Sequence, residues 1–164
     1  AGAMADVVNT IELYRLMDGR ANSIPASEAA FAYRRSGLPE DGVVTAVTVD
    51  LLPGDPAAIR SAMDEARAWR RRTQPVAEPN CGSVFKNPED DHAARLIEAA
   101  GMKGHAVGGA RVSTKHANFI VAAPSSRAAD VLALIGEVQE TVERVSGIRL
   151  EREVHLVGAF DDAA

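Results

Sequence analysis

The sequence predicts an α+β fold, in which a mainly antiparallel sheet carries its helices on one face. Three observations support this prediction: a hairpin signal near the N-terminus, an alternating apolar run over residues 42–52, and two long segments with helical periodicity. The 164 residues suffice for one domain with a core of its own, or for one domain and an incomplete neighbour.

Local signals divide the first part of the chain into short strands and a helix. Asp18-Gly19 is typical of a hairpin turn, and Asp55-Pro56 is typical of an N-cap followed by the first position of a helix. The expected elements are a strand over residues 7–17, a second strand that ends at 24, a short helix over 27–31, a third strand over 42–52, and a helix from 56 to about 72.

The second part of the chain is expected to alternate loops, helices and strands. Gly101 and Gly147 predict the C-terminal ends of two helices, and the second helix is expected to begin after Ser125 or Ser126. The expected elements are a loop over residues 73–91, a helix over 92–100, a strand over 118–122, a long helix that stops at 147, and a final strand over 148–157.

The composition argues against several classes of protein. The hydrophobic share of 46% and the charged share of 25% are those of an ordinary globular protein, and the net charge of −5 argues against a nucleic-acid partner. No apolar run approaches the roughly 20 residues that cross a bilayer, so we expect no membrane insertion. The cysteine and histidine spacings predict no metal site.

Cys81 is the only cysteine of the chain. No internal disulfide can form, so a reducing cytoplasm is the expected location. A cysteine beside Gly82 and Ser83 could act as a nucleophile, but no histidine base lies near it in the sequence. We therefore expect Cys81 to be a small, buried packing residue.

The segment over residues 80–88, Asn-Cys-Gly-Ser-Val-Phe-Lys-Asn-Pro, carries the strongest signal for a site. Gly82 can adopt backbone angles that other residues avoid, so it can present Ser83 sharply. The backbone N–H groups of such a turn, with Lys86 beside them, suit a phosphate or a carboxylate. The Ser83 hydroxyl could donate a hydrogen bond or a proton to a reacting group. Taken alone, a Gly-Ser turn is more often an ordinary loop.

Two arginine-containing segments could bind an anion. Tyr33-Arg34 offers a planar donor fork that suits a substrate carboxylate, although a solvated arginine is the commoner case. Arg70-Arg71-Arg72 could contact an anionic ligand, or could be the cationic C-terminal end of a helix. We favour the helix end for two of these three arginines.

Two later segments are less specific. Paired glycines in the segment over residues 107–119 would let the backbone approach a ligand or another strand closely, but the spacing is not that of a dinucleotide or Walker loop. His116 in this segment is expected to be a hydrogen-bonded structural residue. On the final strand, Glu151 and Glu153 would share one face, which is usually exposed, although one of them could lie buried beside a substrate.

Taken in chain order, these segments resemble the UDP-N-acetylenolpyruvoylglucosamine reductase (UDP-N-acetylmuramate dehydrogenase, MurB) family. The resemblance rests on GSVFKNP at residues 82–88, GGARVSTKHANF at 108–119 and LEREV at 150–154, with Tyr33-Arg34 upstream. It covers the chain from about Asp6 to Gly158 and is closest to the shorter subtype, which lacks an extra tyrosine-bearing loop.

The resemblance implies an NADPH- and FAD-dependent oxidoreductase of peptidoglycan synthesis that reduces UDP-N-acetylglucosamine enolpyruvate to UDP-N-acetylmuramate. In such an enzyme Arg34 and Glu153 would stabilise the enolate that hydride addition creates, and Ser83 would deliver the proton. The other residues that the resemblance or the anion-binding pattern assigns are Tyr33, Lys86 and Asn87 for the substrate and Arg70 for the cofactor.

Within this family the chain is expected to divide between residues 72 and 73. Residues 1–72 would be the incomplete tail of an FAD-binding subdomain, and residues 73–164 the substrate-binding C-terminal domain. Because the Gly-rich flavin loops are absent, the isolated chain is expected to be inactive and to need the missing part for FAD. Thr73 stands where the family often has a lysine, which weakens the expectation of a diphosphate contact there. The alternatives are a stand-alone UDP-sugar-binding module and an inactive remnant.

Overall fold

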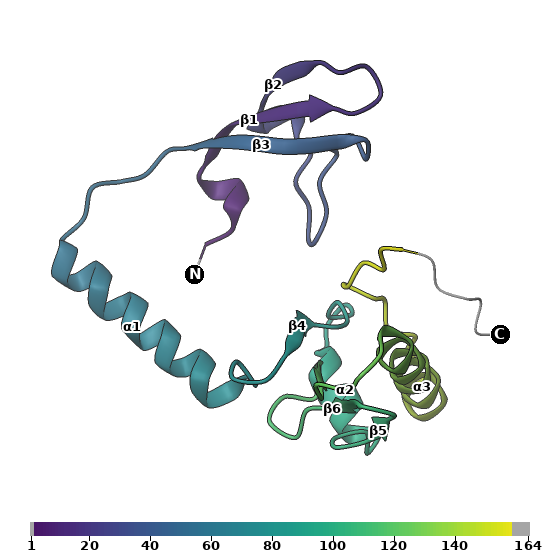
Figure 1. The fold of residues 1–164 in the computed structure, drawn as a ribbon. Coiled ribbons are helices and arrows are strands. Elements are labelled where there is room, and N and C mark those ends of the chain that lie inside the picture. The colour runs from purple at the N-terminus through teal and green to yellow at the C-terminus, as the bar shows by residue number, and fades with distance from the viewer. Residues whose placement is uncertain (1, 159–164) are drawn as a thin grey trace. The chain divides into compact units, whose positions relative to one another are not determined.

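The computed structural model describes residues 2–158 and divides after Ile59 into two compact units, each with a sheet of its own. Figure 1 shows the N-terminal unit in purple to blue and the C-terminal unit in teal to yellow. The strand pairs of both sheets are antiparallel, and helices pack against the C-terminal sheet. The predicted α+β class is therefore confirmed.

Three strands form the N-terminal sheet in the order β2-β1-β3. They are β1 (Val8–Arg15), β2 (Ala21–Pro25) and β3 (Gly42–Val49), and a 3₁₀ turn over Met4–Asp6 precedes them. The β1–β2 connection contains Gly19 at a φ of +67°, as the Asp-Gly signal predicts. Ile11 and Leu13 on the central strand are buried, whereas β3 is exposed along most of its length. The short helix predicted over residues 27–31 is a single 3₁₀ turn, Ala26–Glu28.

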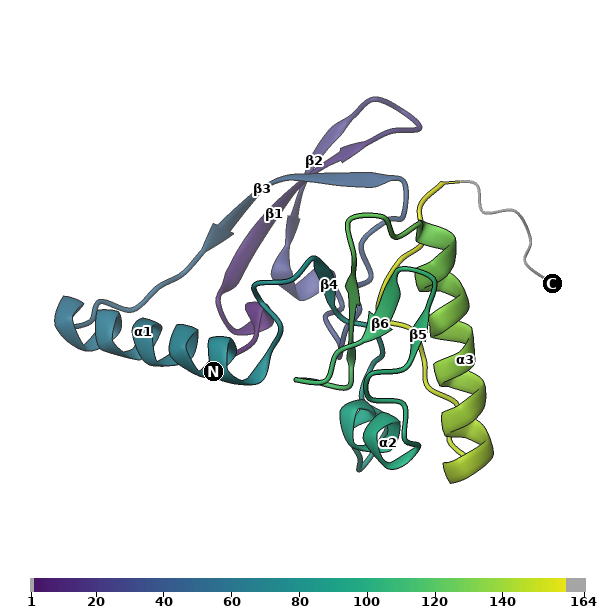
Figure 2. The same cartoon turned by 60° about the horizontal axis from the view of Figure 1, so that its bottom comes forward.

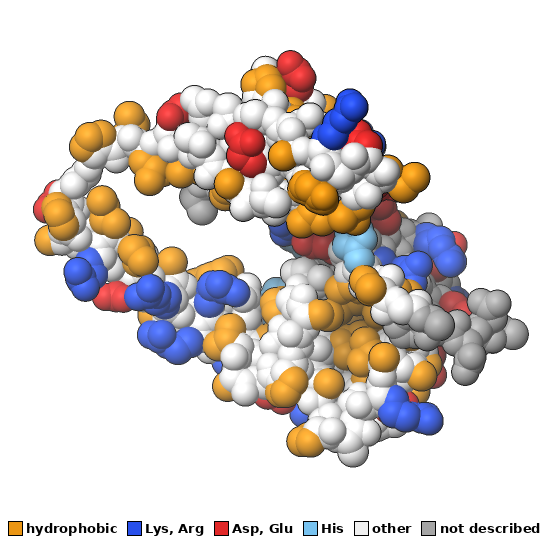
Figure 3. All heavy atoms as spheres, turned by 45° about the horizontal axis from the view of Figure 1, so that its top comes forward, with side chains coloured by type: hydrophobic (Ala, Val, Ile, Leu, Met, Phe, Trp, Pro, Cys, Tyr) orange, Lys and Arg blue, Asp and Glu red, His pale blue; other side chains and the backbone are white. Residues whose placement is uncertain are grey.

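Helix α1 (Pro56–Thr73) begins where the Asp55-Pro56 signal predicts. The Asp55 carboxylate accepts hydrogen bonds from the N–H groups of Ala57 and Ala58, each at 3.2 Å, as an N-cap does. The last turn carries the three consecutive arginines, which confirms their place at a helix end. Figure 3 shows basic side chains in blue and apolar ones in orange along this helix, none of whose residues is buried.

The C-terminal sheet has four strands in the order β4-β7-β6-β5. They are β4 (Asn80–Ser83), β5 (Ala106–Val107), β6 (Ala110–Val112) and β7 (Phe119–Ala122). Helices α2 (Ala93–Ala99) and α3 (Ala128–Ser146) share one apolar core with this sheet, and Figure 2 shows α3 beside β5 and β6. The largest buried side chains of this core include Phe85, Ile97, Leu134, Ile135 and Leu150.

Several predicted boundaries in this unit are wrong. The predicted loop over residues 73–91 contains β4, and the β5–β6 hairpin lies where the sequence predicts no strand. These strands are two to four residues long, so they are too short to show a period of two. The predicted final strand over residues 148–157 contains only an isolated bridge between Phe85 and Arg152.

Helix α3 ends where the sequence predicts, but its N-cap differs from the prediction. The N-cap is Arg127 rather than Ser125 or Ser126, because the Asp130 carboxylate, three residues further on, accepts the Arg127 N–H at 3.0 Å. At the other end Gly147 has a φ of +73°, the left-handed conformation that the sequence predicts for it.

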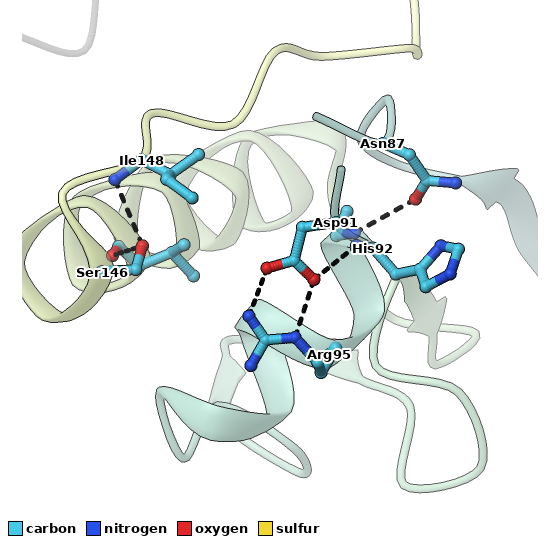
Figure 4. Close-up of polar contacts among 8 residues, drawn as sticks. Asn87, Asp91, His92, Arg95, Ser146 and Ile148 are labelled. Atoms are coloured by element: carbon cyan, nitrogen blue, oxygen red, sulfur yellow. Dashed lines mark hydrogen bonds and ion pairs between the residues drawn. The ribbon is translucent and has the colours of Figure 1, made fainter. Parts of the chain in front are cut away.

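Asp91 joins the loop before α2 to the helix itself (Figure 4). Its carboxylate accepts the N–H of His92 at 2.6 Å and the Nε–H of Arg95 at 2.7 Å. The Arg95 guanidinium, and after it the His92 N–H, lowers the pKa of Asp91 to about 2, from an ordinary value of 3.8. The fold therefore favours the ionised carboxylate.

This lowered pKa predicts part of the acid sensitivity of the chain. A carboxyl group with a lowered pKa contributes stability above pH 3.8, and that contribution is lost as the pH falls toward about 2. Asp91→Asn should therefore lower the urea midpoint of unfolding at pH 6, and the difference from the parent should shrink between pH 3.8 and about 2. Asp90→Asn, which changes the neighbouring carboxylate, is the matched control. An Asp91→Asn deficit that stayed constant down to pH 2 would contradict the assignment.

Candidate functional site

A β-bulge presents Ser83 at the end of β4. Asn80 pairs with Val121 of β7 and Ser83 pairs with Phe119, so three steps along β4 match two steps along β7. Gly82 lies inside this irregularity with a φ of +85°, and its N–H donates to Asn80 Oδ1 at 2.9 Å. A bulge of this kind bends the strand and re-aims the side chain that follows it. The sharp presentation of Ser83 therefore has a specific backbone cause.

Asn118 binds the two residues that follow Ser83. Its backbone C=O accepts the Val84 N–H at 3.0 Å, its Oδ1 accepts the Phe85 N–H at 2.9 Å, and its Nδ2 donates to the Phe85 C=O at 2.8 Å. Asn118 is only 4% exposed. Sequence reasoning missed this residue, because the only local signal is an asparagine directly before an apolar strand.

The segment after Leu150 lies beside residues 84–86, on the side opposite Asn118. The Glu153 N–H donates to the Val84 C=O at 2.8 Å, and the Lys86 N–H donates to the Glu151 C=O at 2.9 Å. Glu153 is half-buried, and its backbone bonds to the residue next to Ser83. The structure therefore brings two of the predicted site residues, Ser83 and Glu153, onto neighbouring segments although they are far apart in the sequence.

Lys86 and Glu151 form an ion pair across these two segments. The Lys86 side chain is 24% exposed and the Glu151 side chain is 72% exposed. Glu151 is therefore paired rather than simply solvated, and it does not share a strand face with Glu153. An ion pair this open to solvent contributes little, about 0–1 kcal/mol, so Lys86 can exchange its partner for a ligand anion at small cost.

Asn87 has a structural role at the start of α2. Its Oδ1 accepts the N–H of Ala93, the first residue of the helix, at 3.1 Å, and Figure 4 shows Asn87 directed at the start of this helix. The Asn87 side chain thus links the loop after β4 to α2. This contact fixes where the amide lies relative to Lys86.

The paired glycines form the turn of the β5–β6 hairpin. Gly108 has a φ of +54°, and a Cβ there would lie 2.5 Å from Cγ of Asp130. The Gly109 N–H donates to the Asp130 carboxylate at 3.2 Å, and a Cβ on Gly109 would lie 2.7 Å from Cα of Ser126. The N–H groups of Arg127 and then Gly109 lower the pKa of Asp130. The close approach is therefore to the start of α3, and the glycines have a structural role.

A cavity of about 460 Å³ lies beside this hairpin. Its lining comes from residues 78–79, 106, 108–111 and 121–124. Neither Ser83 nor Glu153 contributes to it. The cavity is therefore separate from Ser83 and Glu153, although the paired glycines, Gly108 and Gly109, contribute to its lining.

Tyr33 and Arg34 occupy the tip of a tight turn in the N-terminal unit. Ala32 and Arg35 exchange two backbone hydrogen bonds, at 3.0 and 3.1 Å, and so close the turn. Arg34 has a φ of +55°, and its guanidinium lies 5.6 Å from the centre of the Tyr33 ring. A non-glycine residue in this region is strained, and such strain is enriched at functional sites.

The structure gives side-chain contacts within the chain to Arg70 and His116, two further residues that the sequence singles out. Arg70 lies in the exposed last turn of α1, where its Nε–H donates to Gln74 Oε1 at 3.2 Å. His116 accepts the Asn118 N–H at Nδ1 at 3.3 Å and contacts the Phe119 ring edge-on, so the predicted structural role is confirmed. Burial, and then the charge of Lys103, lowers the His116 pKa.

Cys81 corrects a prediction, because it is exposed rather than buried. Partial burial of its thiol nevertheless raises its pKa. A raised pKa disfavours the reactive thiolate at neutral pH. The nucleophile alternative therefore gains no support from the exposure of this residue.

Residues 2–158 contain no cluster of three or more His, Cys, Asp or Glu side chains that could hold a metal ion. Over the same residues, no helix is both long and apolar enough to cross a membrane. The side chains at and beside the bulge offer a hydroxyl, a carboxyl group, an amide and an ammonium group.

Comparisons with known proteins identify the family of the chain. The profile of the family described as "UDP-N-acetylenolpyruvoylglucosamine reductase, C-terminal domain" matches residues 74–157, about half of the chain. The reductase of Anaeromyxobacter sp. (strain Fw109-5) is 48% identical over 97% of this chain and 49% of its own length. The reductase of Moorella thermoacetica is 46% identical over 96% of this chain and 52% of its own length.

A solved structure shares the fold. The crystal structure of UDP-N-acetylenolpyruvylglucosamine reductase (MurB) from Thermus caldophilus superposes with a TM-score of 0.81 at 36% identity, over 94% of this chain and 56% of that one. This chain spans about half the length of the curated relatives it matches. From the profile match and these similarities, the chain belongs to the UDP-N-acetylenolpyruvoylglucosamine reductase family and contains its C-terminal domain.

Proposed function

We propose that this chain supplies the substrate-binding and proton-donating part of an NADPH- and FAD-dependent reductase. The proposed substrate is UDP-N-acetylglucosamine enolpyruvate and the proposed product is UDP-N-acetylmuramate, a precursor of peptidoglycan. Membership of the family supports the reaction class. The observation that carries the assignment to this chain is the neighbouring placement of Ser83 and Glu153 around a glycine bulge.

The proposed reaction adds one hydride and one proton across the carbon–carbon double bond of the enolpyruvyl ether. FAD, when bound, would supply the hydride, with NADPH as the source of electrons. Addition at one vinyl carbon leaves an enolate conjugated with the substrate carboxylate. Glu153, as a neutral acid or a hydrogen-bond donor to that carboxylate, stabilises the developing charge. Ser83 protonates the other carbon and completes the lactyl ether.

The remaining proposed contacts serve the anionic parts of the substrate. Lys86 exchanges its exposed partner Glu151 for a substrate oxygen, and Asn87 binds the sugar nucleotide. Tyr33 and Arg34 present an aromatic face and a guanidinium fork, which suit the substrate carboxylate. They belong to the N-terminal unit, so their assignment rests on their motif and on the strained turn that presents them.

The chain supplies the two side chains that a flavin hydride donor needs beside it. A hydride donor needs a separate proton donor and an acid beside it, and Ser83 and Glu153 supply these two groups. Arg70, at the end of α1, is the proposed cofactor contact within this chain. We propose that the rest of the cofactor site lies in polypeptide that the longer relatives carry.

The proposed organisation places residues 1–72 with the FAD-binding part and residues 73–164 with the substrate. The family profile, which begins at residue 74, supports this boundary. A cytoplasmic location is proposed because the chain has one cysteine and therefore no internal disulfide.

Removal of the Ser83 hydroxyl should separate the two half-reactions in the complete enzyme. Ser83→Ala should leave flavin reduction by NADPH near the parental rate, because that step needs no proton from the serine. Flavin reoxidation by the enolpyruvyl substrate should slow by about 10²–10⁴-fold, the usual contribution of a general acid. Stopped-flow absorbance of the flavin measures both rates.

The matched control is Ser146→Ala, which removes a hydroxyl that donates to the Val142 C=O at 2.7 Å on α3. It should leave both half-reactions unchanged. Normal reoxidation in Ser83→Ala would overturn the proposed mechanism. Tight binding of the UDP-sugar by a parental enzyme that does not reduce it would favour the stand-alone binding module.

Gly82 offers a second test, because its role is conformational. Gly82 and Gly101 both have a positive φ, +85° and +73°, and a Cβ on either would meet nothing within 4 Å. Substitution of either by alanine should therefore cost about 1 kcal/mol of unfolding free energy through backbone strain alone. Only Gly82→Ala should also slow flavin reoxidation, because only it changes how Ser83 is presented. Equal reoxidation rates in the two variants would show that the bulge does not aim Ser83.

Arg34 allows strain and function to be distinguished. Arg34→Gly and Arg34→Ala both remove the guanidinium, so both should slow substrate reduction to the same extent. Glycine accepts a φ of +55° more readily, so Arg34→Gly should be more stable than Arg34→Ala by about 0.5–1 kcal/mol in urea unfolding. If Arg34→Gly kept parental activity, the guanidinium would have no role in the reaction.

A further inference from the structure

We propose that Asn118 is a positioning residue for proton delivery by Ser83. Beyond the bulge, its side-chain amide takes the place of a strand partner for Phe85. In this way Asn118 fixes the backbone of Val84 and Phe85, which follows Ser83 and bonds to Glu153. This inference rests on the proposed function of Ser83 and Glu153. It concerns a residue that touches neither the substrate nor the reacting atoms in the proposed mechanism.

The regular backbone pairing between β4 and β7 ends at Phe119. The last β4–β7 pair is Ser83 with Phe119, and the Phe119 N–H bonds instead to the C=O of His116. Phe85 therefore lacks a backbone partner on this side for its N–H and its C=O. The Asn118 amide meets both groups, with one acceptor at 2.9 Å and one donor at 2.8 Å, as a peptide group in a sheet would do.

Burial makes this arrangement stiff. Phe85 is 2% exposed and Asn118 is 4% exposed, so water cannot readily replace the amide if the strand moves. A displacement would leave a buried N–H and a buried C=O without partners, which is strongly unfavourable. The backbone just after Ser83 is therefore confined to one position.

The same residues also position Glu153. Val84 donates its N–H to the Asn118 C=O on one side and accepts the Glu153 N–H on the other. Asn118, Val84 and Glu153 thus lie in one continuous row of hydrogen bonds. A shift of this row would change the placement of both the proton donor and the acid, whereas the flavin-reducing half-reaction uses neither.

Asn118→Asp tests the amide nearly without change of shape. An ionised carboxylate has no donor for the Phe85 C=O, whereas a protonated carboxyl group has one donor and one acceptor and can replace the amide. In the complete enzyme, flavin reoxidation by the enolpyruvyl substrate should slow by about 10–10²-fold at pH 8. It should recover toward the parental rate as the pH falls through the pKa of the new aspartate. Asn118→Ala should show the loss without the recovery.

Two readouts distinguish positioning from general damage. Flavin reduction by NADPH and the affinity for the UDP-sugar substrate should stay within about twofold of the parent. In the 164-residue chain itself, Asn118→Ala, which removes the acceptor of the Phe85 N–H, should speed hydrogen exchange of the Phe85 amide. His116, whose Nδ1 accepts the Asn118 N–H, and Glu153 are ionisable groups close to Asn118, so the comparison is the ratio of variant to parent at each pH.

Asp130→Ala is the matched control within the same unit. It removes a carboxylate that accepts the N–H groups of Gly109 and Arg127, and it should lower stability without slowing reoxidation. Parental reoxidation in both Asn118 variants, an equal loss in both half-reactions, or the same loss in Asp130→Ala would overturn the role of Asn118. A parental enzyme that the enolpyruvyl substrate does not reoxidise would overturn the proposed function, and the role of Asn118 with it.

Discussion

The backbone over residues 84–86 is hydrogen-bonded on both of its sides, and the candidate site depends on this arrangement. Asn118 bonds to one side, and residues 151–154 bond to the other. Val84 and Phe85 bury their side chains in the core shared with α2 and α3, so the helices support the segment from behind. Ser83 lies at the start of this segment, and Glu153 bonds directly to it. Two residues far apart in the sequence thus share one rigid support.

Elements that depend on local signals could be predicted from the sequence. The Asp55 carboxylate caps α1 through contacts two and three residues away, and Gly147 ends α3 through its own backbone angle. The Asp18-Gly19 turn likewise follows from residues adjacent in the chain. Such signals are independent of the rest of the fold, because they involve one helical turn or one hairpin. The resemblance to the family adds the proposed residue roles, which no local pattern contains.

The rest of the site depends on contacts between distant residues, and no local pattern shows these. Asn118 acts on Phe85 across 33 positions of the sequence. Residues 148–157 are predicted as a strand, yet their backbone forms only a single bridge, to Phe85, and contacts from Gln139 and Ser146 on α3 also hold them. The paired glycines could be interpreted as a ligand loop because their actual neighbour, Asp130, lies 21 positions away from Gly109. Sequence reasoning therefore misses two kinds of feature here: very short strands, and a side chain that makes the hydrogen bonds of a neighbouring strand.

The groups of the proposed site fall into two kinds, and the difference matches the demands of the reaction. Ser83 and Glu153 belong to segments whose backbones are fixed by buried hydrogen bonds, and proton transfer is sensitive to small changes of distance. Lys86 carries its charge on a flexible, partly exposed side chain whose partner Glu151 is open to solvent, and an anion can be bound from several directions. A rigid backbone for the reacting groups and adaptable side chains for the substrate anions would let one site hold a long, charged substrate without moving the groups that react. In the N-terminal unit the turn at Arg34 differs from both kinds, because there the backbone itself holds a proposed binding residue in a costly conformation.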